Sequence, residues 1–153
     1  MSTVSIPDHL PELIRDHIRR YVETDGAEGH MWDSSVFGGP GVVPTLLLTT
    51  TGRKSGKSLT LPLIYGTTET GYAIVASKGG DPSHPAWYLN LSANPEVEVQ
   101  VAAKHFRATA RTAEGPERST LWDQMVGIYA PYTDYQEKTE REIPVVVLEP
   151  LAE

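Results

Sequence analysis

The chain contains no cysteine, and this absence excludes disulfide frameworks, thiolate nucleophiles and iron–sulfur clusters. It also lacks long apolar runs: the longest, at residues 42–48, is far shorter than the roughly 18 residues that a membrane-spanning helix needs. The N-terminus has neither the basic start nor the apolar stretch of a signal peptide. The 153 residues therefore predict one cytoplasmic domain with a single hydrophobic core.

Basic residues are in the minority, with 13 Lys and Arg against 20 Asp and Glu and a formal net charge of -7. An acidic surface repels a phosphate backbone, which argues against nucleic-acid binding. Three basic residues nevertheless fall within five positions, namely Arg53, Lys54 and Lys57. This local excess of positive charge predicts a site for a small anion. The five histidines show no metal-binding motif, so no metal site is expected.

The hydrophobic pattern divides the chain into an N-terminal helix with its connector, residues 1–43, and a β-rich remainder, residues 44–153. Apolar residues at helical spacing predict an amphipathic helix from Asp8 to Glu23, with Asp8 as its N-cap. Five glycines between Asp25 and Gly41 predict an irregular connector. The helix has an apolar face that allows peripheral membrane contact, and we expect the protein to be a monomer.

Six short runs rich in Val, Ile, Leu and Thr predict strands in the remainder of the chain. They lie at residues 44–51, 59–65, 72–77, 97–102, 106–112 and 144–148. Two further helices are predicted at residues 85–93 and 116–129. Short, hairpin-like connections favour a mainly β (α+β) architecture, a partly closed antiparallel barrel with flanking helices, over a parallel α/β sheet.

The densest polar segment reads TTTGRKSGKS, at residues 49–58. It is not a P-loop, because three residues rather than four separate Gly52 from Gly56 and a strand rather than a helix follows. A solvated hairpin turn has a similar composition. The crowding of cations in an acidic chain favours an anion site over such a turn.

The segment ASKGG, at residues 76–80, ends a predicted strand and leads to Trp87 and Tyr88. Paired glycines permit positive φ and let a flat ligand approach the backbone. The segment suits a planar heterocycle with polar edges. The alternative is a tight turn followed by an aromatic core helix, and core packing is the better interpretation of Trp87 alone.

Three tyrosines, Tyr129, Tyr132 and Tyr135, follow a predicted helix at spacings of three. They line up along one side if that helix continues. Each could instead pack with its hydroxyl at the surface, which is the commoner arrangement for tyrosine.

The three segments, together with TEREIPVV at residues 139–146, resemble the deazaflavin-dependent nitroreductase family over residues 44–150. That family uses the reduced 8-hydroxy-5-deazaflavin coenzyme F-420. The resemblance implies a split β-barrel of the flavin-reductase type. It also implies that the basic turn holds the anionic phosphate-bearing tail of the cofactor.

Matching the family's motifs to this sequence implies site residues of three kinds. The catalytic residues are Ser77, which polarises the acceptor, and Tyr129 and Tyr132, with Tyr132 or solvent supplying the final proton. The substrate face comprises Ile64, Ser77, Tyr129, Tyr132 and Tyr135. The cofactor-binding residues are Arg53, Lys54, Ser55, Lys57, Thr60, Leu61, Pro62, Leu63, Ile64, Val75, Ala76, Ser77, Lys78, Gly79, Trp87, Tyr88, Asn90 and Tyr132.

Two positions depart from the family pattern. Leu59 stands where many members have an arginine, and Ile64 stands where some have a tyrosine that faces the substrate. Nitroreduction is therefore not transferred, and a shifted substrate preference is expected.

The leading hypothesis is hydride transfer from the reduced deazaflavin to an electron-poor conjugated acceptor: an enone, quinone, unsaturated lactone or nitroaromatic. One alternative is an FMN-dependent reductase of the same fold. Another is a non-catalytic protein that binds the deazaflavin, a haem or a lipid.

Overall fold

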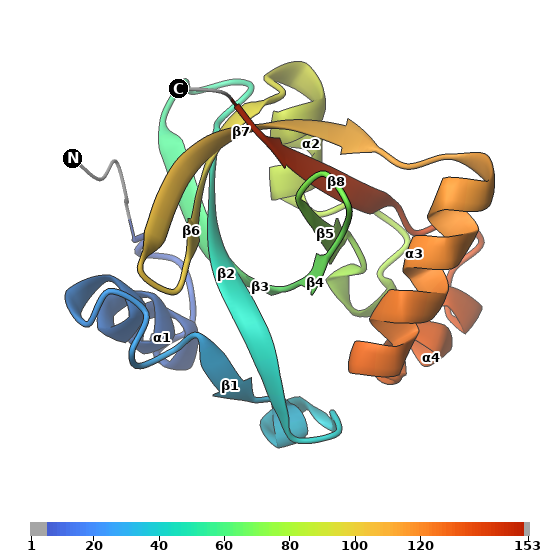
Figure 1. Cartoon of the computed structure of the whole chain (residues 1–153), viewed down its shortest axis with the longest axis horizontal. Helices are drawn as coiled ribbons and strands as arrows, with labels where there is room; N and C mark the ends of the chain where they lie inside the picture. Colours follow the sequence, from blue (N-terminus) through green and yellow to red (C-terminus); the bar gives the residue numbers. More distant parts are fainter. Residues whose placement is uncertain (1–5, 152–153) are drawn as a thin grey trace.

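The computed structural model describes residues 6–151, and its centre is a curled sheet in which every strand pair is antiparallel. The strands follow the order β1-β2-β6-β7-β8-β5-β4, and β3 pairs with the other edge of β2 (Figure 1). Their bounds are β1 (Met31–Asp33), β2 (Val42–Thr51), β3 (Ser58–Ile64), β4 (Gly66–Thr67), β5 (Tyr72–Val75), β6 (Glu96–Val101), β7 (Lys104–Thr112) and β8 (Val145–Pro150).

Four helices flank this sheet, with α1 on one side of the barrel and α3 and α4 on the other (Figure 1). Two short 3-10 turns, η1 and η2, lie in the connections. The bounds are α1 (Glu12–Glu23), η1 (Ser34–Phe37), η2 (Lys78–Gly80), α2 (Ala86–Ala93), α3 (Gly115–Ile128) and α4 (Pro131–Glu137).

The sheet curls into a half-barrel because β3 continues through Tyr65 into β4, and these two short strands pair with different neighbours. β3 pairs with β2, whereas β4 pairs with β5. The bent segment therefore links β2, near one end of the strand order, to β5, near the other end. This confirms the predicted partly closed antiparallel barrel with flanking helices.

The run of four apolar residues at 145–148 is explained by burial of β8 on both faces. Val146 and Leu148 pack in the barrel interior with Leu46 and Ile74. Val145 and Val147 point the other way and pack, with Met125 among others, in a second core cluster.

Helix α1 packs on the outside of the barrel through Ile18 and Tyr21, which are fully buried against Leu47 of β2. The Tyr21 hydroxyl donates to the carbonyl of Thr45 at 2.8 Å and accepts from the amide of Ala102 at 2.8 Å. Burial raises the pKa of Tyr21 to about 12, so this hydroxyl stays protonated. In residues 6–151 no helix has the length and apolarity needed to cross a bilayer.

Several predicted boundaries were wrong. Helix α1 begins at Glu12 and not after Asp8, because extended Pro11 occupies the N-cap position. The connector at residues 25–41 contains β1 and η1, and β4 was not predicted. The strand predicted to end at Ser77 ends at Val75, where the chain turns into η2.

Candidate functional site

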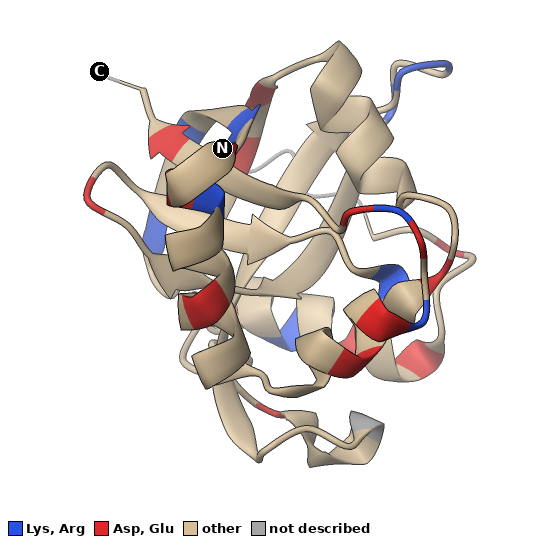
Figure 2. Ribbon diagram, turned by 90° about the vertical axis from the view of Figure 1, so that its right-hand side faces the viewer, with Lys and Arg blue, Asp and Glu red and all other residues tan. Residues whose placement is uncertain are grey.

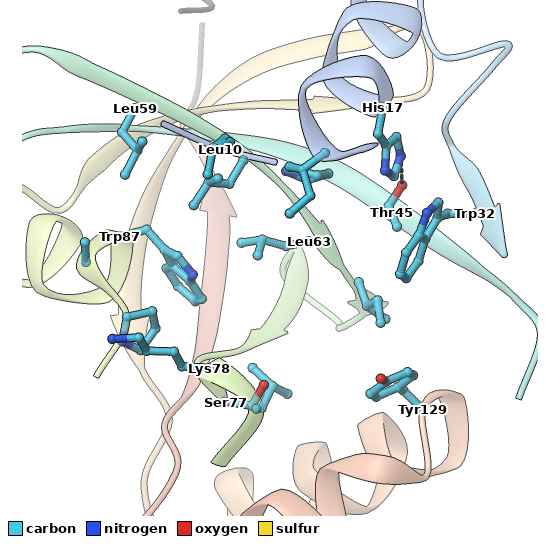
Figure 3. Close-up of a pocket in the computed structure, with 18 of the residues that line it drawn as sticks. Leu10, His17, Trp32, Thr45, Leu59, Leu63, Ser77, Lys78, Trp87 and Tyr129 are labelled. Carbon is cyan, nitrogen blue, oxygen red and sulfur yellow. Dashed lines mark hydrogen bonds between the residues drawn. The ribbon is translucent and has the colours of Figure 1, made fainter. Parts of the chain in front are cut away.

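A pocket of about 580 Å³ lies between α1, β1, β3, η2, the start of α2 and the tyrosines of α3 and α4 (Figure 3). In that view Trp87 and Lys78 lie at one end, and Trp32 and Tyr129 lie at the other. Leu63 points into the space between them. The walls are mainly apolar, and within residues 6–151 Lys78 is the one Lys or Arg that lines the pocket.

Twelve residues expected at the site share this one pocket. They come from four separate segments of the chain, which the fold brings together. They are Leu61, Pro62, Leu63, Ile64, Val75, Ser77, Lys78, Gly79, Trp87, Tyr129, Tyr132 and Tyr135.

The other expected residues lie outside the pocket lining. Arg53, Lys54, Ser55 and Lys57 are exposed on the β2–β3 turn, the blue loop at the upper right of Figure 2. The remaining four make contacts within the protein, so the structure places them around the pocket and not in its wall. These four are Thr60, Ala76, Tyr88 and Asn90. The hydroxyl of Thr60 lies 2.7 Å from that of Thr49, the hydroxyl of Tyr88 lies 2.9 Å from that of Thr112, and Ala76 is fully buried.

The basic turn is tied to helix α2 by Asn90. Buried Asn90 accepts at Oδ1 from both the amide and the guanidinium of Arg53, at 3.2 and 2.9 Å. Its amide group donates to Thr50 at 3.3 Å. Leu59, two residues after Lys57, lines the pocket, so the turn lies at the pocket's edge. Asn90 therefore holds the turn in place, and its polar atoms are used within the protein.

The turn after β5 has an unusual backbone. Ser77 is right-handed, whereas Lys78, Gly79 and Gly80 have φ values of 46, 63 and 84°. A right-handed residue followed by a left-handed one makes consecutive amides converge on a small concavity, a nest for negatively charged oxygen atoms. Among the described residues, no hydrogen bond uses the amides of Ser77, Lys78 or Gly79.

Arg141 holds this turn from outside the pocket lining. Its guanidinium donates to the carbonyls of Ala76 at 3.3 Å, Ser77 at 2.9 Å and Asp81 at 2.8 Å. It also contacts Nδ1 of His84 at 3.2 Å. Burial lowers the pKa of Arg141, but the guanidinium stays charged because the ordinary pKa of an arginine lies far above 7.

The three tyrosines do not lie on one continuous helix. Tyr129 caps the end of α3, and Tyr132 and Tyr135 belong to the separate helix α4, which begins at Pro131. They still form one cluster, with the Tyr129 and Tyr135 hydroxyls 2.9 Å apart. Burial raises the pKa of Tyr129 and of Tyr132 far above the ordinary value of a phenol.

Part of the pocket comes from the N-terminal region, which the sequence motifs did not indicate. Leu10, Leu13, Ile14 and His17 of this region line the pocket, together with Trp32 of β1. The His17 ring stacks on Trp32 with centroids 5.8 Å apart. The apolar stripe of the helix was a signal for burial, but nothing local indicated which surface it covers.

His17 is held in this wall by its ring nitrogen. Nε2 lies 2.9 Å from the carbonyl of Gly29 and 3.4 Å from the hydroxyl of Thr45 (Figure 3). Burial lowers the pKa of His17, which keeps the ring neutral at pH 7. A neutral ring whose Nε2 donates to Gly29 leaves Nδ1 free of a proton.

A pocket with apolar walls, unused amides on one edge and a cationic turn beside it suits a planar, anionic cofactor. The sequence model of a protein family described as F420H(2)-dependent quinone reductase matches residues 13–150. The chain belongs to this family. The match begins at residue 13, so it covers all of α1 but its first residue, whereas the resemblance over residues 44–150 had left this helix out.

Individual F420H(2)-dependent quinone reductase relatives support the same assignment. The chain is 44% identical over 140 residues to one from Mycobacterium tuberculosis, covering 90% of this chain and 89% of that one. A solved structure described as an F420-H2 dependent reductase is 53% identical, with a TM-score of 0.63 over 69% of this chain and 94% of its own. A third chain, described as a domain-swapped dimer, is 45% identical, with a TM-score of 0.66 over 90% of this chain and 98% of that chain.

Proposed function

We propose that the protein is a deazaflavin-dependent reductase that passes a hydride from reduced coenzyme F-420 to a quinone. The observation that carries this proposal is the pocket itself: apolar walls, a backbone nest and a neighbouring cationic turn, in a member of the F420H(2)-dependent quinone reductase family. When bound, the reduced deazaflavin supplies the hydride. Enones, unsaturated lactones and nitroaromatics are further electron-poor acceptors to be compared with quinones.

The residues present fit such a cofactor. The side chains of Leu61, Leu63 and Trp87 give an apolar surface for a flat ring. Lys54 and Lys57 are exposed and free to pair with phosphate or carboxylate groups on a tail that leaves the pocket. The nest at Ser77–Gly79 offers unused donors to ring carbonyl oxygens.

The acceptor is assigned to the end of the pocket near Tyr129, Tyr135 and Trp32. Ser77 lies at the boundary between this end and the turn, where its hydroxyl can donate to an acceptor oxygen as that oxygen gains negative charge. The apolar side chains of Leu13 and Ile14 limit access of water from the α1 side. The chain thus contributes orientation, exclusion of water and polarisation of the acceptor.

The final proton is assigned to solvent. Tyr132 is a weak proton donor because burial strongly disfavours its phenolate. The Tyr129 hydroxyl is paired with that of Tyr135, and this hydrogen bond, after burial, raises the pKa of Tyr129 and stabilises its neutral form. The tyrosines therefore act in this proposal as a wall for the acceptor and as hydrogen-bond donors.

The test is a titration and turnover assay on the purified full chain. Oxidised coenzyme F-420 and FMN are titrated separately and followed by fluorescence, and reduced coenzyme F-420 is then mixed with a water-soluble benzoquinone. We expect binding of the deazaflavin in preference to FMN, and oxidation of the reduced form that requires the protein. Preferential FMN binding would favour the FMN-dependent alternative. Deazaflavin binding without turnover of any acceptor would favour a non-catalytic binding protein.

Gel filtration with light scattering tests the oligomeric state. A monomer remains our expectation for this chain. Because one relative is described as a domain-swapped dimer, the assay is performed over a range of protein concentrations.

A further inference from the structure

Arg141 fixes the orientation of two consecutive peptide groups at the edge of the pocket. Its Nη1 donates to the carbonyl of Ala76 and its Nη2 donates to the carbonyl of Ser77. In a trans peptide the carbonyl and the next amide N–H point in opposite directions. With both carbonyls directed at Arg141, the N–H groups of Ser77 and Lys78 point away from it. Ser77 and Lys78 line the pocket, and Arg141 does not.

All the backbone carbonyls that the Arg141 guanidinium reaches belong to residues 76–81. The third carbonyl that it reaches, that of Asp81, closes the same segment, and Gly80 packs closely against the backbone of Tyr135. The turn thus contacts both Arg141 and helix α4. Lys78 has a φ of 46°, a conformation that is costly for a residue with a side chain. Such a backbone persists when its surroundings determine it.

We propose that Arg141 is a positioning residue that aims the Ser77 and Lys78 amides into the pocket and strengthens them as donors to a ring carbonyl oxygen bearing negative charge. The strengthening follows because a cation on the carbonyl side polarises each peptide group and makes its N–H more acidic. This inference rests on the proposed function. The oxygen belongs either to the bound deazaflavin or to the quinone as it accepts the hydride, and the experiment separates these two sources.

The test compares Arg141→Ala with a matched control, Arg118→Ala. Arg118 also donates to a backbone carbonyl, that of Ile143 at 2.6 Å, but Ile143, unlike Ser77, does not line the pocket. Each variant is titrated with oxidised coenzyme F-420, and its hydride-transfer rate is measured in single turnovers with saturating reduced cofactor and a benzoquinone. Both measurements are repeated with millimolar guanidinium chloride, which can occupy the space left by the arginine.

We expect a loss of about tenfold in Arg141→Ala, the effect of weakening a charge-assisted interaction, and partial recovery with guanidinium. A loss confined to the dissociation constant assigns the oxygen to the deazaflavin, and a loss confined to the hydride-transfer rate assigns it to the quinone. Values within about twofold of wild type in both measurements, or an equal loss in Arg118→Ala, would overturn the proposal. Failure of guanidinium to restore any of the loss would also overturn it, since a collapsed turn is not rescued by a small cation.

A second readout does not depend on the cofactor. In ¹⁵N–¹H correlation spectra of the free protein, the amide protons of Ser77 and Lys78 should move upfield in Arg141→Ala and stay in place in Arg118→Ala. Unchanged resonances would contradict the inference, whereas inactivity of the wild type would contradict the proposed function. If Arg141→Ala does not fold, Arg141→Lys takes its place, because lysine keeps the charge but not the planar fork. Arg141→Lys should then show an intermediate loss, and wild-type values would again overturn the proposal.

Discussion

The Arg53 guanidinium donates to Oδ1 of Asn90 at 2.9 Å, and this bond connects the basic turn to the helix that carries Trp87. The position of the cationic turn is therefore fixed relative to the end of the pocket that Trp87 forms. Arg53 is used to hold the turn, which leaves Lys54 and Lys57 as its cations available to a ligand.

Lys54→Ala should weaken binding of oxidised coenzyme F-420 by about three- to tenfold, because a solvent-exposed charge-assisted contact is lost. Higher ionic strength should weaken wild-type binding in the same direction. Fluorescence titration measures both effects. Lys104→Ala, at the exposed β6–β7 turn, is the control and should bind normally. If the affinity for oxidised coenzyme F-420 changes neither in Lys54→Ala nor with ionic strength, the turn is a solvated hairpin and not an anion site.

Ser77→Ala should leave the affinity for the deazaflavin nearly unchanged and lower the hydride-transfer rate, because the donor to the acceptor oxygen is removed. Loss of one such donor typically raises the barrier by ~2.7–4 kcal/mol. Stopped-flow oxidation of the reduced cofactor by a quinone and by an enone measures this. Ser119→Ala, on the exposed face of α3, is the matched control. An unchanged rate with both acceptors would remove Ser77 from the catalytic residues.

Tyr132→Phe should change turnover by less than about threefold, without altering the solvent isotope effect, because a buried phenol with a strongly raised pKa gives up its proton poorly. For the same reason Tyr129 and Tyr132 stay protonated as the pH rises, so these two residues should add no alkaline decline to the rate between about pH 7 and 10. Rates in H₂O and D₂O across this range provide the measurement. A large loss with a changed isotope effect would restore Tyr132 as the proton donor.

Tyr21→Phe should destabilise the protein by about 1–3 kcal/mol, because the part-buried Ala102 amide loses its acceptor and the carbonyl of buried Thr45 loses its donor. Urea unfolding measures the change. Tyr88→Phe, which loses a bond to Thr112 near the surface, should cost less. Equal costs would mean that the hydrogen bonds of the buried Tyr21 hydroxyl stabilise the fold no more than the exposed bond of Tyr88 does.

The free energy of unfolding should fall as the pH drops below about 6.5. Burial lowers the pKa of His17, so in this pH range the unfolded chain binds a proton at His17 more readily than the folded protein does. The contribution of His17 is complete above pH 6.5 and is lost as the pH falls through the lowered pKa. Melting temperatures at pH 7.5 and 5.5 measure the decline. His17→Gln should reduce it, whereas His9→Gln, on an exposed residue, should leave it as in wild type. An equal decline in His17→Gln would assign the effect to other groups.

The strands and most helices could be predicted from the sequence because their signals are local. β-branched runs end at Gly or Pro, and Val97, Val99 and Val101 of β6 face the barrel core as their alternation predicts, whereas Gln100 on the expected solvent face is buried. The pair Gly79 and Gly80 correctly predicted positive φ. The start of α1 was missed because Asp8 is a good N-cap by composition, whereas Pro11 sets the boundary through its extended backbone.

The sequence by itself determined the barrel class, the basic turn and the three segments that carry the family resemblance, since each depends on residues close together in the chain. Only the tertiary structure decided that α1 and Trp32 complete the pocket and that Arg141 lies behind Ser77. The physical reason is closure of the barrel: pairing of β5 with β8 brings together residues 64 positions apart. Local sequence preferences do not determine which distant backbone carbonyl an arginine side chain will bond.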